Sequence, residues 1–355
     1  MRITKKGALL LFFLFQIIAL KILRQFPEFV EAYYSNGIYV FISKAIRYSF
    51  GWVPISVGDV FYTLASIYIL RWFYMNFKRI YKDTLSWFLD IGVFISLAYF
   101  GFHMLWGFNY YRLPLHESLH IKANYTTQEL VAFTDKLITK TNEVQSKLGE
   151  SDSVKIVIPY SKSDIFKNVQ NGYEELSKVY PHLKYSPKSL KTSLFSLPLT
   201  YMGFSGYLNP FTNEAQVDGL IPIYKFPTTS CHEVAHQLGY AAENEANFIG
   251  ALAAINNKDL YFKYSGYSFI LRYCLSELYK RDRKIYEELL PRINYGILLN
   301  YREVQDFWEN YRNPLEPYFE KTFDTFLKAN NQSAGIKSYN YVVALMVNYF
   351  ENKTL

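Results

Sequence analysis

Two histidines and a glutamate in the second half of the chain have the spacing of a zinc site. His232, Glu233 and His236 form the motif His-Glu-x-x-His. On a helix, positions i and i+4 lie on one face, one turn apart, so both imidazoles can bind one Zn²⁺. Glu233, next to the first histidine, can reach a water molecule on the metal and act as a general base. The motif therefore predicts hydrolysis by a metal-activated water, with one Zn²⁺ per chain.

A catalytic zinc site needs a third protein ligand and leaves the fourth position to water. No histidine follows His236, so we expect an acid. Gly239 is placed to end the helix, and on a second helix beginning soon after it Glu243 and Asn247 share a face. Glu243 is the expected ligand, and Asn247 would hydrogen-bond a ligating histidine. Glu245 is the reserve ligand, although it points about 200° around the helix from Glu243.

The motif and its surroundings resemble known metalloenzymes. The stretch from His232 to His236, followed by Glu243-Asn-Glu-Ala-Asn247, resembles the gluzincin metallopeptidases, whose third ligand is a Glu on a later helix with Asp or Asn four residues on. The connection here is much shorter than in the thermolysin-like and CAAX-protease-like branches, so the choice between Glu243 and Glu245 stays open. Residues 203–215 and the stretch after the motif are similar to a bacterial family of multi-span membrane proteins classified as a domain of unknown function. This resemblance covers most of the chain and implies a zinc site without naming a substrate.

The positive charge of the chain is concentrated in its N-terminal third. The 355 residues carry a formal net charge of +7. Residues 1–108 hold 11 Lys and Arg against 5 Asp and Glu, a net charge of +6, whereas the remainder holds 27 against 26, a net charge of +1. Because the excess accompanies apolar stretches, we expect it to orient the chain in a membrane, and we expect no nucleic-acid partner.

Three apolar stretches in this third reach the roughly 20 residues that a bilayer requires. They predict transmembrane helices at about residues 7–23, 55–77 and 85–108. The first resembles a signal peptide but lacks a small-x-small cleavage site, so we expect it to remain as an anchor. Residues 37–53 combine charges with many aromatic residues, and an interfacial amphipathic helix suits them better than a span. We therefore predict a membrane domain over residues 1–110, with the lipid bilayer as a partner.

The basic residues also predict the orientation of the chain. The basic N-terminus and the loop at residues 78–82 belong on the cytoplasmic side, which puts everything after Tyr110 outside. We expect the protein in a bacterial inner membrane, with residues 111–355 forming an extracytoplasmic catalytic domain on the periplasmic face. The two cysteines exclude a disulfide scaffold. Cys231 is expected to be a small buried residue, and a disulfide between Cys231 and Cys274 is the alternative.

After residue 110 the pattern combines amphipathic helices with a small amount of strand. The stretch Thr126–Glu129 is a capping box that begins a helix, and residues 259–280 predict another. Val154 to Pro159 is rich in branched residues and predicts a strand. Residues 189–222 predict two or three further strands separated by turns. The expected fold class is an integral membrane protein, mainly α, with about three N-terminal transmembrane helices followed by an α+β zincin-like domain that contains a small sheet.

One predicted hairpin lies just before the zinc motif. In zincins an edge strand at this place binds substrate backbone by adding it as an extra strand. We therefore expect the substrate to contact the first half of the hairpin, Gly203, Phe204, Ser205, Gly206 and Tyr207. The glycines indicate either close approach of a peptide or a bulge in the strand.

These features predict a membrane-anchored zinc metallopeptidase acting on a peptide or protein substrate, for which membrane and envelope proteins are candidates. The oxyanion formed during hydrolysis needs a further donor, and the tyrosines that could supply it are Tyr201, Tyr207, Tyr267 and Tyr273. The alternative is a catalytically inactive, zinc-stabilised interaction or scaffold domain on a membrane anchor. A metal-free membrane scaffold with an accidental motif is a second alternative, which metal content distinguishes from the other two.

Overall fold

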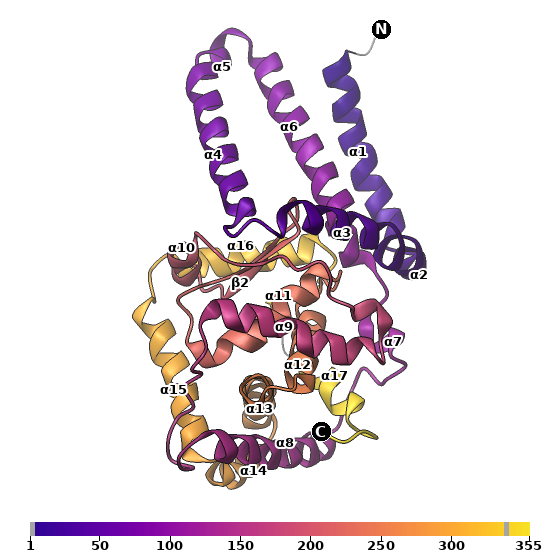
Figure 1. Ribbon diagram of the computed structural model, residues 1–355. Helices are drawn as coiled ribbons and strands as arrows, with labels where there is room; N and C mark the ends of the chain where they lie inside the picture. The colour runs from indigo at the N-terminus through magenta and orange to yellow at the C-terminus, as the bar shows by residue number, and fades with distance from the viewer. Residues whose placement is uncertain (1–3, 337–340) are drawn as a thin grey trace.

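The computed structural model describes residues 4–336 and 341–355, and it has two parts (Figure 1). Three long helices project in one direction and form a stalk: α1 (Lys5–Leu23), α4 (Val57–Asn76) and α6 (Thr84–Leu105). The short helix α5 (Arg79–Lys82) joins α4 to α6 at the far end, near the N-terminus. The other elements form a rounded body that contains the sheet and the zinc motif.

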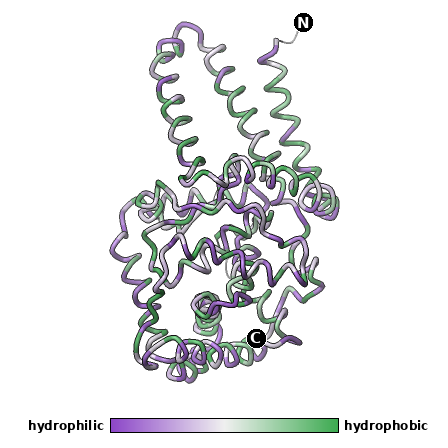
Figure 2. Tube along the Cα trace, viewed as in Figure 1, coloured by the Kyte–Doolittle hydropathy of each residue, from purple (hydrophilic) through white to green (hydrophobic). Residues whose placement is uncertain are grey.

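Two stalk helices, α1 and α6, are long and apolar enough to cross a membrane by length and composition. Figure 2 shows hydrophobic residues along most of both helices. The second predicted span is also a helix, α4, of 20 residues, but Asp59, Arg71 and several tyrosines lower its apolarity. The described residues therefore contain two candidate membrane helices rather than the three that the sequence predicts.

Three short elements connect α1 to α4: α2 (Pro27–Phe29), the π-helical segment η1 (Val30–Ile38) and α3 (Tyr39–Phe50). The helix α3 occupies the stretch predicted as an amphipathic helix, with Tyr39 and Arg47 buried and Phe41 exposed. Tyr39 Oη and Arg47 Nη1 donate hydrogen bonds to Gln237 O, at 2.9 and 3.2 Å. These bonds attach α3 to the end of the helix that carries the zinc motif.

The sheet has three strands in the order β1-β3-β2: β1 (Leu190–Thr192), β2 (Gly206–Asn209) and β3 (Glu214–Val217). β1 is parallel to β3, and β2 is antiparallel to it, so β2 and β3 form the predicted hairpin. Asn209 Oδ1 closes the turn by accepting hydrogen bonds from Phe211 N and Thr212 N, at 3.0 and 3.2 Å. β2 lies at an edge of the sheet, as predicted.

The rest of the body is helical. Its longer helices are α8 (Thr127–Leu148), α9 (Lys162–Ser177), α11 (Phe226–Gln237), α12 (Glu243–Asn256), α13 (Leu260–Arg281), α15 (Tyr295–Asn310) and α16 (Glu316–Ala329). Its shorter helices are α7 (Leu115–Ser118), α10 (Ser196–Tyr201), α14 (Arg283–Leu289) and α17 (Val342–Tyr349). Single 3-10 turns occupy Gly107–Tyr111, Pro181–Leu183, Ile223–Lys225 and Leu290–Arg292. The capping box at Thr126 is confirmed at the start of α8, and the helix predicted at residues 259–280 is α13.

The strand predicted at residues 154–159 is wrong. This segment has no strand partner among the described residues. Instead, Ile156 N donates to Asn300 Oδ1 at 3.0 Å, and Asn300 Nδ2 donates to Ile156 O at 3.1 Å. A side chain of α15 thus pairs with the backbone as a neighbouring strand would, and Ile156 and Ile158 are buried in the core without forming a sheet.

The centre of the body is α12, which is buried along nearly its whole length between α9, α11 and α13. Gly250 permits the close contact with α11, because a Cβ added there would lie 2.6 Å from His232 N and 2.7 Å from His232 Cα. Cys231 and Cys274 are both buried in this core, and both are free thiols.

Gly250→Ala is expected to destabilise the fold by about 1–3 kcal/mol, because α11 and α12 must separate to admit the methyl group. The thermal unfolding midpoint of the full chain in detergent measures the effect. The matched control is Gly101→Ala on α6, whose new Cβ would meet its nearest neighbour at an ordinary 3.4 Å. Equal midpoints for the two variants would contradict the close packing of α11 on α12.

Candidate metal centre

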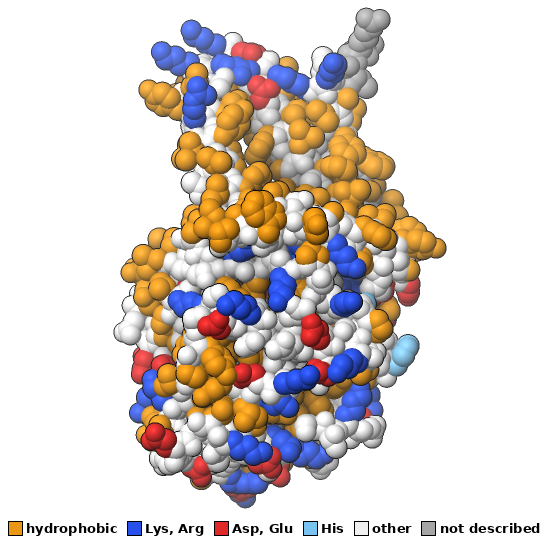
Figure 3. All heavy atoms as spheres, in the orientation of Figure 1, with side chains coloured by type: hydrophobic (Ala, Val, Ile, Leu, Met, Phe, Trp, Pro, Cys, Tyr) orange, Lys and Arg blue, Asp and Glu red, His pale blue; other side chains and the backbone are white. Residues whose placement is uncertain are grey.

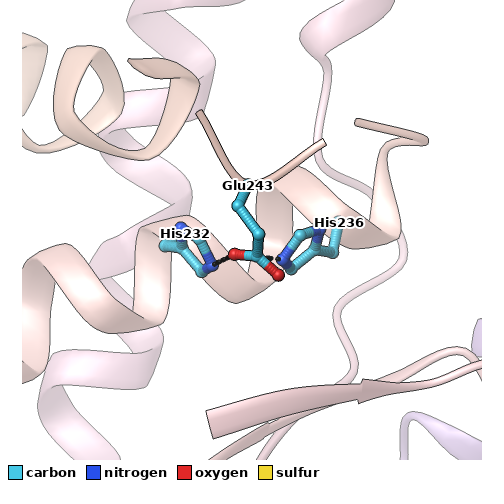
Figure 4. A group of neighbouring side chains, drawn as sticks. All are labelled: His232, His236 and Glu243. Carbon is cyan, nitrogen blue, oxygen red and sulfur yellow. Dashed lines mark ion pairs between the residues drawn. The ribbon is translucent and has the colours of Figure 1, made fainter. Parts of the chain in front are cut away.

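The zinc motif lies on the last two turns of α11, and the chain then reverses direction to begin α12. Gly239 makes this reversal with a φ of +91°, which confirms it as the predicted stop of the helix. Tyr240 N donates to Ala235 O at 3.1 Å and holds the turn against α11. As a result the first residue of α12, Glu243, lies beside both histidines of the motif (Figure 4).

Three potential ligand atoms meet at this point. Glu243 Oε2 lies 3.4 Å from His232 Nε2 and 3.7 Å from His236 Nε2. The ligand atoms of the three residues all lie within 4.8 Å of one another. Two atoms bound at about 2.0–2.1 Å to one tetrahedral zinc ion lie roughly 3.4 Å apart. The three side chains are therefore spaced as ligands of a single metal ion would be.

Glu245, the reserve ligand, lies elsewhere. Its Oε1 accepts a hydrogen bond from Leu115 N at 2.7 Å. Burial raises the pKa of its carboxyl to about 7, and the nearby Arg112 opposes that rise. The structure thus brings Glu243 to the histidines and turns Glu245 toward Arg112, in keeping with their angular separation on one helix.

Glu243 and the two histidines shift one another's pKa values. Burial alone would raise the pKa of Glu243, but the two histidines outweigh it and hold that pKa well below its usual range. Burial alone would lower the pKa of His236, but Glu243 outweighs it and raises the pKa to about 9. Glu243 is therefore ionised at neutral pH, and a bound cation would take the place of the proton that its carboxylate stabilises on His236.

The orientation of His236 is set by the backbone. Its Nδ1 lies 2.7 Å from Tyr240 O. Because a carbonyl oxygen can only accept, Nδ1 carries a proton, and Nε2 is the ring nitrogen that faces Glu243 and that a metal ion would bind in place of a proton. Trp106 Nε1 donates to His236 O at 3.0 Å, so the end of the stalk helix α6 also contacts this turn of α11.

Asn247, predicted to hold a ligating histidine, lies beside His232 and Tyr273 and acts on the pKa of both. His232 Nδ1 and Asn247 Nδ2 are buried, and neither has a hydrogen-bond partner among the described residues. The side chain occupies the predicted place, one turn after Glu243 and beside His232.

Glu233 lies at the wall of a cavity of about 700 Å³ beside the cluster. Burial raises the pKa of its carboxyl to about 8. Its Oε2 has no hydrogen-bond partner among the residues that the structure describes. A carboxyl group in this environment can exchange a proton near neutral pH, which is what a general base requires.

The cavity brings the predicted substrate segment to the cluster. All five of its residues line the cavity together with the ligands: Gly203, Phe204, Ser205, Gly206 and Tyr207. Gly206 is in close contact with Glu233, because a Cβ there would lie 2.5 Å from Glu233 Oε1. The glycine at this position therefore makes room for Glu233, and the strand β2 continues regularly from it without a bulge.

Of the four tyrosines considered as oxyanion donors, only Tyr207 and Tyr273 line the cavity. Tyr207 donates its hydroxyl to Asp59 of α4. Tyr201 packs against Tyr311, with ring centroids 5.3 Å apart. Burial raises the pKa of Tyr273 to about 12, so its hydroxyl stays protonated at neutral pH and is able to donate.

Several cavity residues were missed by sequence reasoning. Tyr110 and Lys225 line the cavity, as do Tyr62 of α4 and Phe102 of α6. Burial lowers the pKa of Lys225 to about 8. No local pattern marks Tyr62, Phe102 and Tyr110, because each reaches the cluster through a contact between distant parts of the chain. Lys225, by contrast, directly precedes α11, which carries the motif. The aromatic run at residues 106–111 was the one sequence feature that could have indicated such contacts, but it is equally typical of an aromatic girdle at a membrane surface.

The site and fold define a mostly helical chain with a His-His-Glu cluster on two consecutive helices and a stalk of apolar helices. The chain belongs to the family described as Protein of unknown function (DUF3810), whose model matches residues 34–347. No curated protein and no solved structure matches it. The match spans the His-Glu-x-x-His motif, and the family description names no activity.

Proposed function

We propose that this chain is a membrane-anchored zinc metallopeptidase that hydrolyses peptide bonds. One observation carries the proposal: three ligand atoms of His232, His236 and Glu243 lie within 4.8 Å of one another. Glu233 lies next to them on the wall of a cavity that is large enough for a peptide segment. The proposed zinc ligands, the proposed base and a cavity for the substrate therefore lie next to one another.

The donor set suits zinc. Two imidazoles and one carboxylate are the ligands of several catalytic zinc sites, and three protein ligands leave one position for water. The group found among the described residues has those three members, whereas a structural zinc site is more often closed by four. Bound zinc would lower the pKa of a water molecule and polarise the carbonyl group to be hydrolysed. This ligand count favours an enzyme over an inactive zinc-stabilised domain.

The protein groups around the cluster have separate tasks in the proposed reaction. Glu233 accepts the proton of the attacking water and delivers it to the leaving amine. Tyr273 donates its hydroxyl to the oxygen of the scissile carbonyl as negative charge develops there. The edge strand β2 offers the unpaired side of its backbone to an extended peptide. These tasks match a peptide bond that crosses the cavity between β2 and α11.

The stalk supports a membrane location. Figure 3 shows Lys and Arg side chains gathered at its far end, with hydrophobic side chains below them. Basic residues favour the cytoplasmic side of a membrane. We therefore propose that α1 and α6, with α4 as a third span, anchor the chain in a bacterial inner membrane with the body on the periplasmic face.

Metal removal tests the proposed activity. Full-length protein in detergent would be assayed with a degenerate peptide library carrying a fluorophore and a quencher. Removal of zinc with 1,10-phenanthroline is expected to lower hydrolysis at least a hundredfold, and added Zn²⁺ should restore it. Hydrolysis that continues at zero metal content would refute the zinc mechanism. A zinc-loaded chain that cleaves no peptide would instead favour the inactive zinc domain.

A further inference from the structure

The cavity beside the cluster has one wall in the stalk. Tyr62 of α4 and Phe102 of α6 line it, together with Phe211 from the turn between β2 and β3. Phe195 and Leu199, at the start of and within α10, line it too, and so does Phe323 of α16. In Figure 1, α10 and α16 lie across the top of the body, next to the bases of α4 and α6. The apolar side of the cavity therefore faces the membrane helices.

The base of α4 is bound to β2, which lines the cavity, and to β3 beside it. Asp59, in the first turn of α4, accepts hydrogen bonds from Tyr207 Oη and from Leu194 N, the latter at 2.7 Å. Glu214 of β3 accepts one from Val57 N at 3.2 Å. The end of α6 is bound through Trp106 to His236 O. Each helix is thus fixed to an element of the site, α4 to the hairpin and α6 to α11.

The two helices contact each other at their far end and are separated at their bases. At the far end, the rings of Trp72 and Trp87 lie 6.0 Å apart. At the base, the ring of Phe211 lies 5.6 Å from that of Phe61 on α4. Phe211 also borders α6, because a Cβ on Gly101 would lie 3.4 Å from its ring. The ring of Phe211 therefore lies between α4 and α6, next to the cavity.

Exposed aromatic and aliphatic side chains surround this place. On and beside α3, Phe41, Tyr48 and Trp52 are 76, 79 and 78% exposed. Tyr318 on α16 is 70% exposed. Figure 3 shows hydrophobic side chains where the stalk meets the body. Such residues typically mark the level of the lipid headgroups, which supports a membrane surface at the junction of the stalk and the body.

We propose that the substrate is a membrane-anchored polypeptide, which enters the cavity from the bilayer between α4 and α6, past Phe211. The inference rests on the proposed peptidase function. An apolar anchor would stay in contact with α4, α6 and lipid, while the adjacent extended segment pairs with β2 and places its peptide bond at Glu233. A polypeptide suits the cavity better than a lipid, because the free strand edge of β2 offers hydrogen bonds to a peptide backbone.

Photo-crosslinking tests the route without requiring turnover. In the Glu233→Gln chain, reconstituted in phosphatidylcholine vesicles, benzoylphenylalanine would replace Phe211 or, as a control, Tyr68, which is 62% exposed on α4 and outside the cavity lining. The probe is a palmitoylated peptide library carrying biotin. We expect crosslinking at position 211 several times stronger than at position 68, and competition by unlabelled palmitoylated peptide.

Each other result has a definite meaning. Equal labelling at positions 68 and 211 would refute the route between the helices. Competition by a palmitoyl lipid alone, without peptide, would indicate a lipid substrate and refute the polypeptide. Equal competition by the library without its palmitoyl chain would show that the anchor is not recognised. If labelling at 211 behaves as expected but the zinc-loaded native chain cleaves no peptide, the peptidase proposal fails while the entry route stands.

The ratio between the cleavage rates of the palmitoylated and the plain peptide library gives a second test of the entry route. Phe211→Asp is expected to lower the cleavage of palmitoylated relative to plain library about tenfold, because a charge at the membrane surface opposes passage of an apolar anchor. Phe211→Leu should largely keep the native ratio. An unchanged ratio in the Asp variant would contradict entry past Phe211.

Discussion

Replacing Glu233 with Gln is expected to lower peptide hydrolysis on the order of a thousandfold while about one zinc ion stays bound to each chain. Gln has the shape of Glu but cannot accept the proton of the attacking water. The fold should tolerate the change, because Glu233 Oε2 has no hydrogen-bond partner among the described residues. A buried carboxyl whose pKa is raised to about 8 also loses little when it is replaced by a neutral amide. Turnover of the peptide library and elemental mass spectrometry of the same sample measure both effects.

The control for this variant is a second buried acid nearby. Glu245→Gln keeps an oxygen that can accept the hydrogen bond from Leu115 N. Activity in this control should stay within about twofold of native, since it touches neither metal nor base. Full activity in Glu233→Gln would refute the proposed mechanism. Loss of zinc together with activity would mean that Glu233 is needed for the site itself and would leave its role as base unsupported.

The local part of the site could be predicted because it depends on helix periodicity alone. A spacing of four places His232 and His236 on one face, and a helix beginning after Gly239 places Glu243 and Asn247 on another. The angular separation of Glu243 and Glu245 then separates their environments, and the structure shows the first at the histidines and the second at Arg112. The hairpin was predictable for a similar reason, since Asn209 closes its turn through local hydrogen bonds.

The rest of the site depends on contacts between distant segments, which no local pattern encodes. The contact of Trp106 with His236, and that of Asp59 with Tyr207, join the stalk to residues more than a hundred positions later. Asp59 illustrates the difficulty. In sequence it weakens an apolar span, whereas in the structure it attaches α4 to the cavity wall. Likewise Ile156 pairs with a side chain of α15 rather than with a strand, so branched residues alone predicted the wrong element.

Metal content should separate the two nearby acids of α12. Native full-length protein is expected to hold about one zinc ion per chain, and Glu243→Gln is expected to hold almost none after dialysis, since an amide is a weak zinc ligand. Glu245→Gln should hold as much zinc as native protein. The two variants change the same chemical group two residues apart on one helix, so a general loss of folding would affect both, whereas loss of a ligand affects only one.

The pattern of zinc loss tests the arrangement of α11 and α12 as well as the identity of the third ligand. Loss only in Glu243→Gln would agree with a carboxylate oxygen 3.4 Å from His232 Nε2 and 3.7 Å from His236 Nε2. Loss only in Glu245→Gln would require α12 to turn by about 200° and to give up the hydrogen bond to Leu115. The packing of Gly250 against His232 does not permit that rotation, so this result would refute the arrangement of α11 and α12. Native protein that is folded and holds no zinc would refute the proposed metallopeptidase function and favour a metal-free membrane scaffold.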